Sequence, residues 1–207
     1  GLWRGAWGGD TGPCPGQGVR DGHPESRKKG VEGSLKRLRL DRLVRYQLHR
    51  IDPNVPLEDS VGALKEMRDA GKIRHLGLSE VTTEEIARAR KIVPIATVQN
   101  RYNVADRKWE EVLRYCEKEG LGFMPWSPVG GGRSLKDAAV VTVATEQKAS
   151  VFQVALARLP TDPPVMQPIP RTSSVAHTAQ YVAASNAQLA DAHMHTQRTS
   201  RRATPRH

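Results

Sequence analysis

Between residues 43 and 128, short apolar runs alternate with longer segments in which apolar residues recur at helical spacing. The short runs cover residues 43–49, 73–79, 95–100 and 121–125. Each run ends in polar side chains and a loop, which is the pattern of β-strands that pair in parallel and are joined by helices. Ligands bind at the carboxyl ends of parallel strands, so the polar residues there are the first candidates for a functional site.

The segments between these runs carry signals for the start and end of helices. Pro56 is expected to open one helix and Gly71 to end it, and Thr82 with Glu85 fits a capping box at the start of the next. Asp106 is expected to be the N-cap of a third helix. We expect further helices at 27–40, at 135–145, at 151–159 behind a capping box of Ser150 and Gln153, and from Ser173 or Ser174 onward, and a further strand at 165–169.

The chain has 207 residues, of which 38% are hydrophobic, and this is enough for one sizeable core. No run approaches the roughly 18 apolar residues of a membrane span, and the first residues lack the apolar stretch of a secretory signal. We therefore expect no membrane contact and a cytoplasmic location. Cys14 and Cys116 lie far apart and neither belongs to a C-x-x-C motif, so we expect no disulfide framework and no metal site.

The formal net charge of +10 raises the question of nucleic-acid binding, since clustered Lys and Arg neutralise phosphates. The distribution of the charge argues against it. Between Arg20 and Arg50 the basic residues are interleaved with leucine at helical spacing, and the basic carboxyl-terminal tail has no aromatic residues on which bases could stack. We expect a solvated basic face, with nucleic acid as an unlikely partner.

Six strings of residues stand out along the chain: 33–41, Tyr46 to His49, Gly71 to Ser79, Val98 to Asn103, Pro125 to Pro128 and Ile169 to His177. Together, and in this order, they resemble signatures of the aldo/keto reductases, a family of NADPH-dependent barrel enzymes. Periodicity alone does not distinguish an open sheet from a closed barrel. The resemblance implies an α/β fold of the parallel (β/α)8 TIM-barrel type, incomplete here with about five or six of its eight strands. We expect the partial barrel over residues 31–190, an irregular segment over 1–30 and a disordered basic tail over 191–207.

The resemblance assigns one catalytic residue, His49. In the family a histidine orients the carbonyl substrate, while a tyrosine, supported by a lysine and an aspartate, donates the proton. A strand-end imidazole can donate to a carbonyl oxygen, although a structural histidine bonded to a loop carbonyl is the alternative. The other three groups have no counterpart in the sequence, which resembles a truncated family member, and Tyr46 points to the opposite face of its strand from His49. We therefore expect this chain to be a weak or inactive carbonyl reductase.

The resemblance also implies an NADP(H) site. Ser79 and Gln99 would hydrogen-bond the nicotinamide carboxamide, which offers both a donor and an acceptor. Trp126 would stack on the nicotinamide ring. The remaining implied contacts are Ser127, Val129 and Gly131 to the pyrophosphate, Arg171, Thr172 and Ser173 to the 2′-phosphate, and His177 in the adenosine-phosphate segment.

Two other functions remain open from the sequence. One is a non-catalytic NADP-binding or interaction module, and the other is a basic nucleic-acid-binding protein. A barrel that lacks its opening strands also exposes sheet edges, which predicts self-association. The resemblance implies a small-molecule carbonyl compound as the substrate.

Overall fold

The computed structural model describes residues 7–9, 21–130, 136, 138–157, 159, 165–170, 174 and 177–179. The chain divides into two compact units, each of which is treated by itself. The first unit comprises residues 1–100 and 118–123, and the second comprises residues 101–117 and 124–207. The predicted basic tail at 191–207 lies outside the described residues.

The first unit is built on a parallel sheet whose strand order follows the sequence. The strands are β1 (Trp7–Gly9), β2 (Leu43–Leu48), β3 (Ile73–Ser79), β4 (Ile95–Gln99) and β5 (Gly122–Phe123). Every neighbouring pair is parallel. The predicted parallel α/β arrangement is therefore confirmed, and each strand pairs with the next one in the chain, as in a (β/α) barrel.

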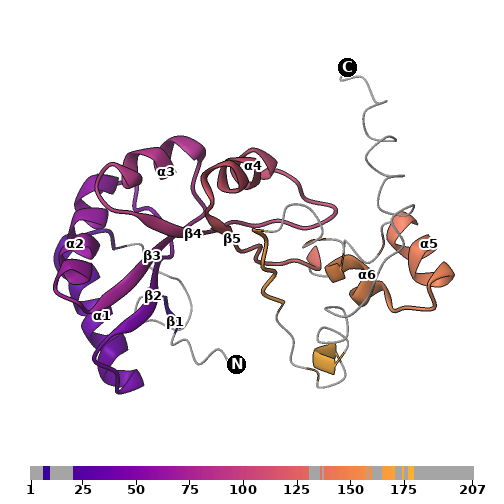
Figure 1. The fold of residues 1–207 in the computed structure, drawn as a ribbon, viewed down its shortest axis with the longest axis horizontal. Coiled ribbons are helices and arrows are strands. Elements are labelled where there is room, and N and C mark those ends of the chain that lie inside the picture. Colours follow the sequence, from indigo (N-terminus) through magenta and orange to yellow (C-terminus); the bar gives the residue numbers. More distant parts are fainter. Residues whose placement is uncertain are drawn as a thin grey trace. The chain divides into compact units, whose positions relative to one another are not determined.

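Three helices connect these strands and lie along the same side of the sheet (Figure 1). They are α1 (Pro24–Leu38), α2 (Leu57–Asp69) and α3 (Thr83–Arg90). Helix α2 packs against both α1 and β3, and α3 packs against β4. The core between helices and sheet is apolar and nearly inaccessible to water. Its members include Val31, Leu48, Val61, Leu64, Leu76, Leu78 and Ile86.

Helix α1 begins at Pro24, three residues before the predicted helix start at residue 27, so the helix extends into the segment that was predicted to be irregular. The segment before the helix is fixed by contacts far along the chain. The backbone N–H of Gly22 donates to Asp52 Oδ2 at 2.9 Å, and the Ser60 hydroxyl donates to the Gly22 carbonyl at 2.6 Å. A Cβ at position 22 would lie 2.6 Å from the Asp52 Cβ, so only glycine allows this close approach.

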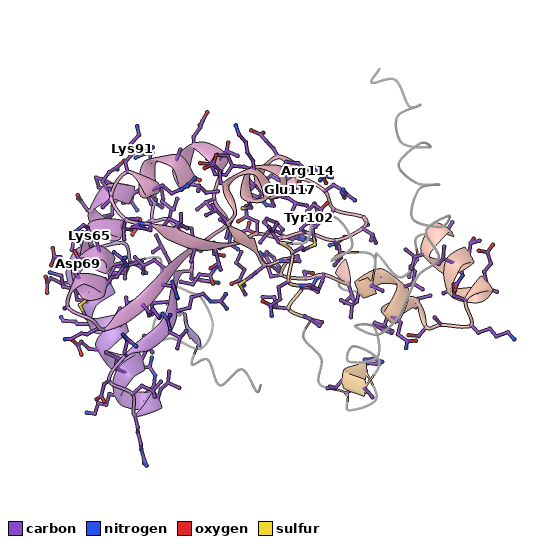
Figure 2. All side chains as sticks on the ribbon, in the orientation of Figure 1. Lys65, Asp69, Lys91, Tyr102, Arg114 and Glu117 are labelled. Atoms are coloured by element: carbon purple, nitrogen blue, oxygen red, sulfur yellow. The ribbon has the colours of Figure 1, made fainter. Side chains whose placement is uncertain are left out.

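The helix signals at 56–71 and 82–85 are confirmed. Pro56 is the N-cap of α2, and Gly71 follows the helix with a φ of +78°. The Lys72 N–H donates to the Met67 carbonyl at 3.0 Å, which completes a Schellman motif. Thr82 and Glu85 form the reciprocal capping box of α3. Lys65 and Asp69 form an ion pair one helical turn apart on α2 (Figure 2).

The second unit corrects two predictions. Helix α4 (Glu110–Glu119) begins four residues after Asp106, which is therefore not its N-cap. Instead Asp106 Oδ1 accepts from the Lys108 N–H at 3.3 Å within the preceding turn. The predicted strand at 165–169 is not formed, because Met166 alone makes a bridge there. A strand needs a paired neighbour along its length, and the prolines around this run cannot donate to one.

The remaining described elements are α5 (Ala138–Glu146) and α6 (Val151–Ala157). The predicted capping box opens α6. The Ser150 N–H donates to Gln153 Oε1 at 2.9 Å, and the Gln153 N–H donates to Ser150 Oγ at 3.2 Å. Across the described part of the chain, no helix is both long enough and apolar enough to span a bilayer.

Candidate functional site

Three predicted site residues of the first unit lie at the carboxyl ends of adjacent strands. His49 directly follows β2, Ser79 is the last residue of β3, and Gln99 is the last residue of β4. The register pairs Ser79 with Gln99, and Leu48, the neighbour of His49, with Leu78. The structure thus brings these three residues to one edge of the parallel sheet, where ligands bind in such folds.

The ends of β3 and β4 are held together by side-chain hydrogen bonds. The Ser79 hydroxyl donates to the Gln99 carbonyl at 2.8 Å. Next to it, Asn100 Oδ1 accepts from the Val81 N–H at 3.1 Å, and Asn100 Nδ2 donates to the Val81 carbonyl at 2.8 Å. Asn100 is fully buried. We call these Asn100–Val81 bonds the strand-end clamp, because they fix the positions of Ser79 and Gln99.

Two polar side chains at this edge keep their hydrogen-bonding capacity. Within the described part of the chain, neither the His49 imidazole nor the Gln99 amide makes a hydrogen bond. The Gln99 amide offers an acceptor and two donors, which is the complement that a carboxamide requires. The donor set at this edge therefore fits the nicotinamide group that the sequence predicted.

The charge state of His49 is set by its neighbours. Partial desolvation of the ring lowers the pKa of His49, the positive charge of Arg50 lowers it further, and Glu80 acts in the opposite direction. A lowered pKa keeps the imidazole neutral at neutral pH, so that one ring nitrogen donates and the other accepts. Such a group can donate a hydrogen bond to a carbonyl oxygen without carrying a charge.

In the second unit, Trp126 lies in a short loop held by backbone and side-chain bonds. It forms an isolated parallel bridge with Arg101, whose guanidinium carbon lies 5.7 Å from the centre of the indole ring. The Tyr102 N–H donates to the Trp126 carbonyl at 3.3 Å, and Asn103 Nδ2 donates to the Ser127 carbonyl at 3.1 Å. These contacts fix the backbone that carries the indole.

The loop after Trp126 contains a tight turn that includes Ser127 and Val129. Ser127 and Gly130 have φ values of 55° and 61°, and the Gly130 N–H donates to the Ser127 carbonyl at 2.8 Å. Left-handed backbone of this kind leaves N–H groups accessible for anions. The next predicted contact, Gly131, lies outside the described residues.

The predicted 2′-phosphate contacts, Arg171, Thr172 and Ser173, also lie outside the described residues. The neighbouring His177 is described. Its backbone N–H lies 3.4 Å from Ser174 Oγ, as expected where Ser174 caps a helical turn, and its ring centre lies 4.7 Å from that of Phe152 in α6.

The structure argues against Tyr102 as a proton donor. Its hydroxyl donates to Glu110 Oε2 at 2.6 Å, and burial together with this carboxylate raises the pKa of Tyr102 far above its usual value. Arg107 and Arg114 pair with the same carboxylate, and Arg114 also pairs with Glu117 (Figure 2). This cluster stabilises the start of α4 rather than supplying an acid.

Tyr46 does not replace the missing acid either. It is 1% exposed, and burial raises the pKa of its hydroxyl. Alternation along β2 turns it away from the face that carries His49. As for metals, no group of three or more His, Cys, Asp or Glu side chains is placed to hold an ion within the described ranges.

Sequence reasoning did not identify two residues at the strand ends, Asn100 and Glu80. Asn100 stands in one of the quoted strings, but its part in the strand-end clamp depends on the backbone of the loop that follows β3. Glu80 follows Ser79 directly and pairs with Arg50 at 3.0 Å. A polar residue immediately after a strand is the only signal that the sequence offers for either.

Comparisons with known proteins give the family and the fold of this chain. The Aldo/keto reductase family model matches residues 14–200. An uncharacterized oxidoreductase of Schizosaccharomyces pombe is 40% identical over 169 residues, which are 81% of this chain and 55% of that protein. Pyridoxine 4-dehydrogenase of Escherichia coli is 37% identical over 174 residues, covering 81% of this chain and 61% of the enzyme.

Among solved structures, an aldo/keto reductase from Klebsiella pneumoniae in complex with NADP and acetate superposes with a TM-score of 0.73 and 29% identity, over 84% of this chain and 64% of that one. The fold is thus that of the TIM-barrel reductases. The chain spans between 55% and 61% of the length of these two curated relatives. By the extent of the family match, the protein is a member of the aldo/keto reductase family.

Proposed function

We propose that this chain binds NADP(H) and belongs to an oxidoreductase that transfers hydride between the cofactor and a small aldehyde or ketone. The observation that carries the proposal is the set His49, Ser79 and Gln99 at the carboxyl ends of three adjacent parallel strands, inside the family match. The polar groups of His49 and Gln99 are available to a ligand there, while Ser79 is fixed to its neighbour.

Each residue has a role that its chemistry supports. Gln99 would hydrogen-bond the nicotinamide carboxamide, and Ser79, whose proton is donated to the Gln99 carbonyl, would accept from the carboxamide through its hydroxyl oxygen. Trp126 would offer its flat face to the ring. Ser127, Val129 and Gly131 would approach the pyrophosphate through their backbone. Arg171, Thr172 and Ser173, with His177 nearby, would bind the 2′-phosphate. When bound, the cofactor supplies the hydride, and His49 holds the carbonyl oxygen by a hydrogen bond.

The catalytic set of the 207-residue chain is nevertheless depleted. The family resemblance implies four catalytic groups, and His49 is the one residue of this chain that it assigns to any of them. Tyr102 is bonded to Glu110, and Tyr46 is buried on the other face of β2. If no side chain donates the proton, the reduction loses general acid catalysis, which typically contributes 10²–10⁴-fold to the rate. We therefore propose that this chain binds NADPH but turns it over slowly or not at all.

Two measurements on the 207-residue chain test the proposal. NADPH binding is followed by cofactor fluorescence, and turnover is followed by loss of NADPH absorbance with a reactive aldehyde. We expect saturable binding and little turnover. A Gln99→Ala variant should weaken binding, whereas His75→Ala, which removes an exposed side chain of β3, should not.

The outcomes separate the candidate functions. Absence of NADPH binding by a folded chain would contradict cofactor binding. Rapid aldehyde reduction that His49→Ala abolishes would contradict the depleted activity while supporting the role of His49. Tight binding without turnover would support a non-catalytic NADP-binding module, the second candidate, which the depleted catalytic set favours.

Location and self-association remain separate proposals. We propose a cytoplasmic protein whose sheet edges can pair with another copy. In the described sheet the outer strands are β1 and β5, and both are short, which limits such pairing. Light scattering would show a defined oligomer if the edges pair, and a monomer if they do not.

A further inference from the structure

The residue after β3, Glu80, has a backbone conformation that side chains rarely adopt. Its φ is 56°, in the left-handed region where glycine is the usual residue. The backbone is fixed there because the Glu80 N–H donates to the Gln99 carbonyl at 3.1 Å, and the strand-end clamp holds the next residue. Strain of this kind persists only where surrounding structure imposes it, and it gathers at functional sites. Glycine would remove the strain, so the Glu80 side chain calls for an explanation.

The Glu80 carboxylate reaches across to the neighbouring strand end. Its Oε2 lies 3.0 Å from Nη1 of Arg50, which follows His49 after β2. The two side chains are 15% and 34% exposed, whereas the Glu58 and Arg88 side chains of the pair between α2 and α3 are 45% and 51% exposed. A pair shielded from water is weakened less by solvent and salt. The Arg50–Glu80 pair therefore joins the ends of β2 and β3 beside His49.

The charges of both Arg50 and Glu80 act on the protonation equilibrium of His49. Arg50 disfavours the protonated imidazole and so does Arg27 from α1, while Glu80 favours it. Because Arg50 is bound to Glu80, the two opposite charges lie close together and partly cancel at the imidazole. Removing one member would leave the other uncompensated and would release the backbone next to His49.

We propose that Glu80 is a positioning residue, which holds Arg50 beside His49 and thereby fixes the charge environment of His49 at the carbonyl-binding edge. The inference rests on the proposed role of His49 for its functional meaning. Its physical content concerns Glu80, Arg50 and His49 alone, and it can be tested without cofactor or substrate. It also explains why a glutamate occupies a position where glycine would be free of strain.

The test is a titration of the His49 ring protons by NMR on the full 207-residue chain, with the resonance assigned by its loss in His49→Gln. In Glu80→Gln we expect the pKa of His49 to fall further below the wild-type value, because the charge that favours imidazolium is gone and that of Arg50 remains. Adding Arg50→Gln to this variant should bring the pKa back up. Glu58→Gln, which breaks the exposed pair with Arg88, is the matched control and should leave the titration unchanged.

Glu80→Gly separates positioning from stability. This variant removes the carboxylate but relieves the left-handed strain, so the fold should be as stable as the wild type or more so by thermal unfolding. We still expect the His49 titration to move as in Glu80→Gln. If the His49 titration in a folded Glu80→Gly or Glu80→Gln chain superimposes on the wild-type curve, the inference is wrong.

The same samples distinguish this inference from the proposed function. A wild-type chain that does not bind NADPH, but whose His49 titration responds to Glu80, would overturn the cofactor proposal and support the positioning role. A chain that binds NADPH with a His49 titration unaffected by Glu80 would do the reverse. Arg50→Gln alone should raise the pKa of His49, and a fall would contradict the inference.

Discussion

Replacing Asn100 by alanine should destabilise the protein strongly, because the strand-end clamp satisfies two backbone groups that water cannot reach. Asn100 and Val81 are both 0% exposed. The substitution leaves the Val81 N–H and carbonyl without their partners, and each unsatisfied buried group costs about 1–3 kcal/mol. The free energy of unfolding should therefore fall by about 2–6 kcal/mol. For a chain of this size, in which 1 kcal/mol shifts Tm by about 2–4 °C, this lowers Tm by roughly 4–24 °C.

The measurement is urea unfolding followed by circular dichroism, with the slope m compared between variants. Asn100→Asp retains the acceptor for the Val81 N–H but turns a carboxylate oxygen toward the Val81 carbonyl, so it should be destabilised to a similar degree. Lys91→Ala, at an exposed position, is the control and should change stability by less than about 1 kcal/mol. An Asn100→Ala protein within about 0.5 kcal/mol of wild type, with m unchanged, would refute the reasoning.

Three further substitutions test the core and the loop before α1. Leu64→Ala empties a fully buried position of α2 and should lower the free energy of unfolding by about 2–5 kcal/mol in urea titrations; a loss under about 1 kcal/mol would mean that the site collapses. Gly77→Ala should cost about 1–3 kcal/mol in the same assay, since its Cβ would lie closer to the Thr97 hydroxyl than van der Waals contact allows and only 3.1 Å from the Thr97 carbonyl oxygen. The Asn54 and Gly22 N–H groups lower the pKa of Asp52 in the folded protein. The ionised carboxylate therefore stabilises the fold at pH values above its ordinary pKa of 3.8, and this stabilisation is lost as the pH falls through the folded pKa. Asp52→Asn should make the free energy of unfolding less dependent on pH in the acid range, and an unchanged dependence would contradict this.

The helices of the first unit were predictable from sequence because their signals are local. The capping box of Thr82 and Glu85 joins residues three positions apart, and Gly71 ends α2 through its own backbone freedom. The prediction that Asp106 is the N-cap of α4 was wrong because its carboxylate instead binds the Lys108 N–H and the Arg101 guanidinium. Side chains of Asp stabilise turns as readily as helix starts, so the residue type alone did not decide between them.

The predicted strand at 165–169 failed for a different reason. An apolar run indicates that a segment can be buried, but a strand also needs a neighbouring strand whose backbone N–H and C=O groups are available in the matching register. At this point the Ile169 N–H donates to the Pro125 carbonyl at 3.3 Å, and Met166 makes the only bridge of the run. Flanking prolines were the warning, since they interrupt any ladder.

In the candidate site, too, some residues could be predicted from the sequence and others could not. His49, Ser79 and Gln99 could be selected from sequence because each is polar and follows an apolar run, and parallel strands bring such positions to one edge. Asn100 and Glu80 could not, since their roles depend on bonds to the loop that follows β3 and on a left-handed backbone. Sequence patterns predict which face of a sheet a side chain lies on, but its hydrogen-bonding partner on a neighbouring segment is known only from the folded structure.

The sequential order of the strands also has a consequence for biosynthesis. Because each strand of the sheet pairs with the one made just before it, a chain leaving the ribosome meets its next partner already in place. The β2–α2–β3 portion can therefore fold while later residues are still being translated, and few contacts in the sheet join residues that are far apart in the sequence. Growth of the sheet is in this sense vectorial, from the amino-terminal strands toward β5.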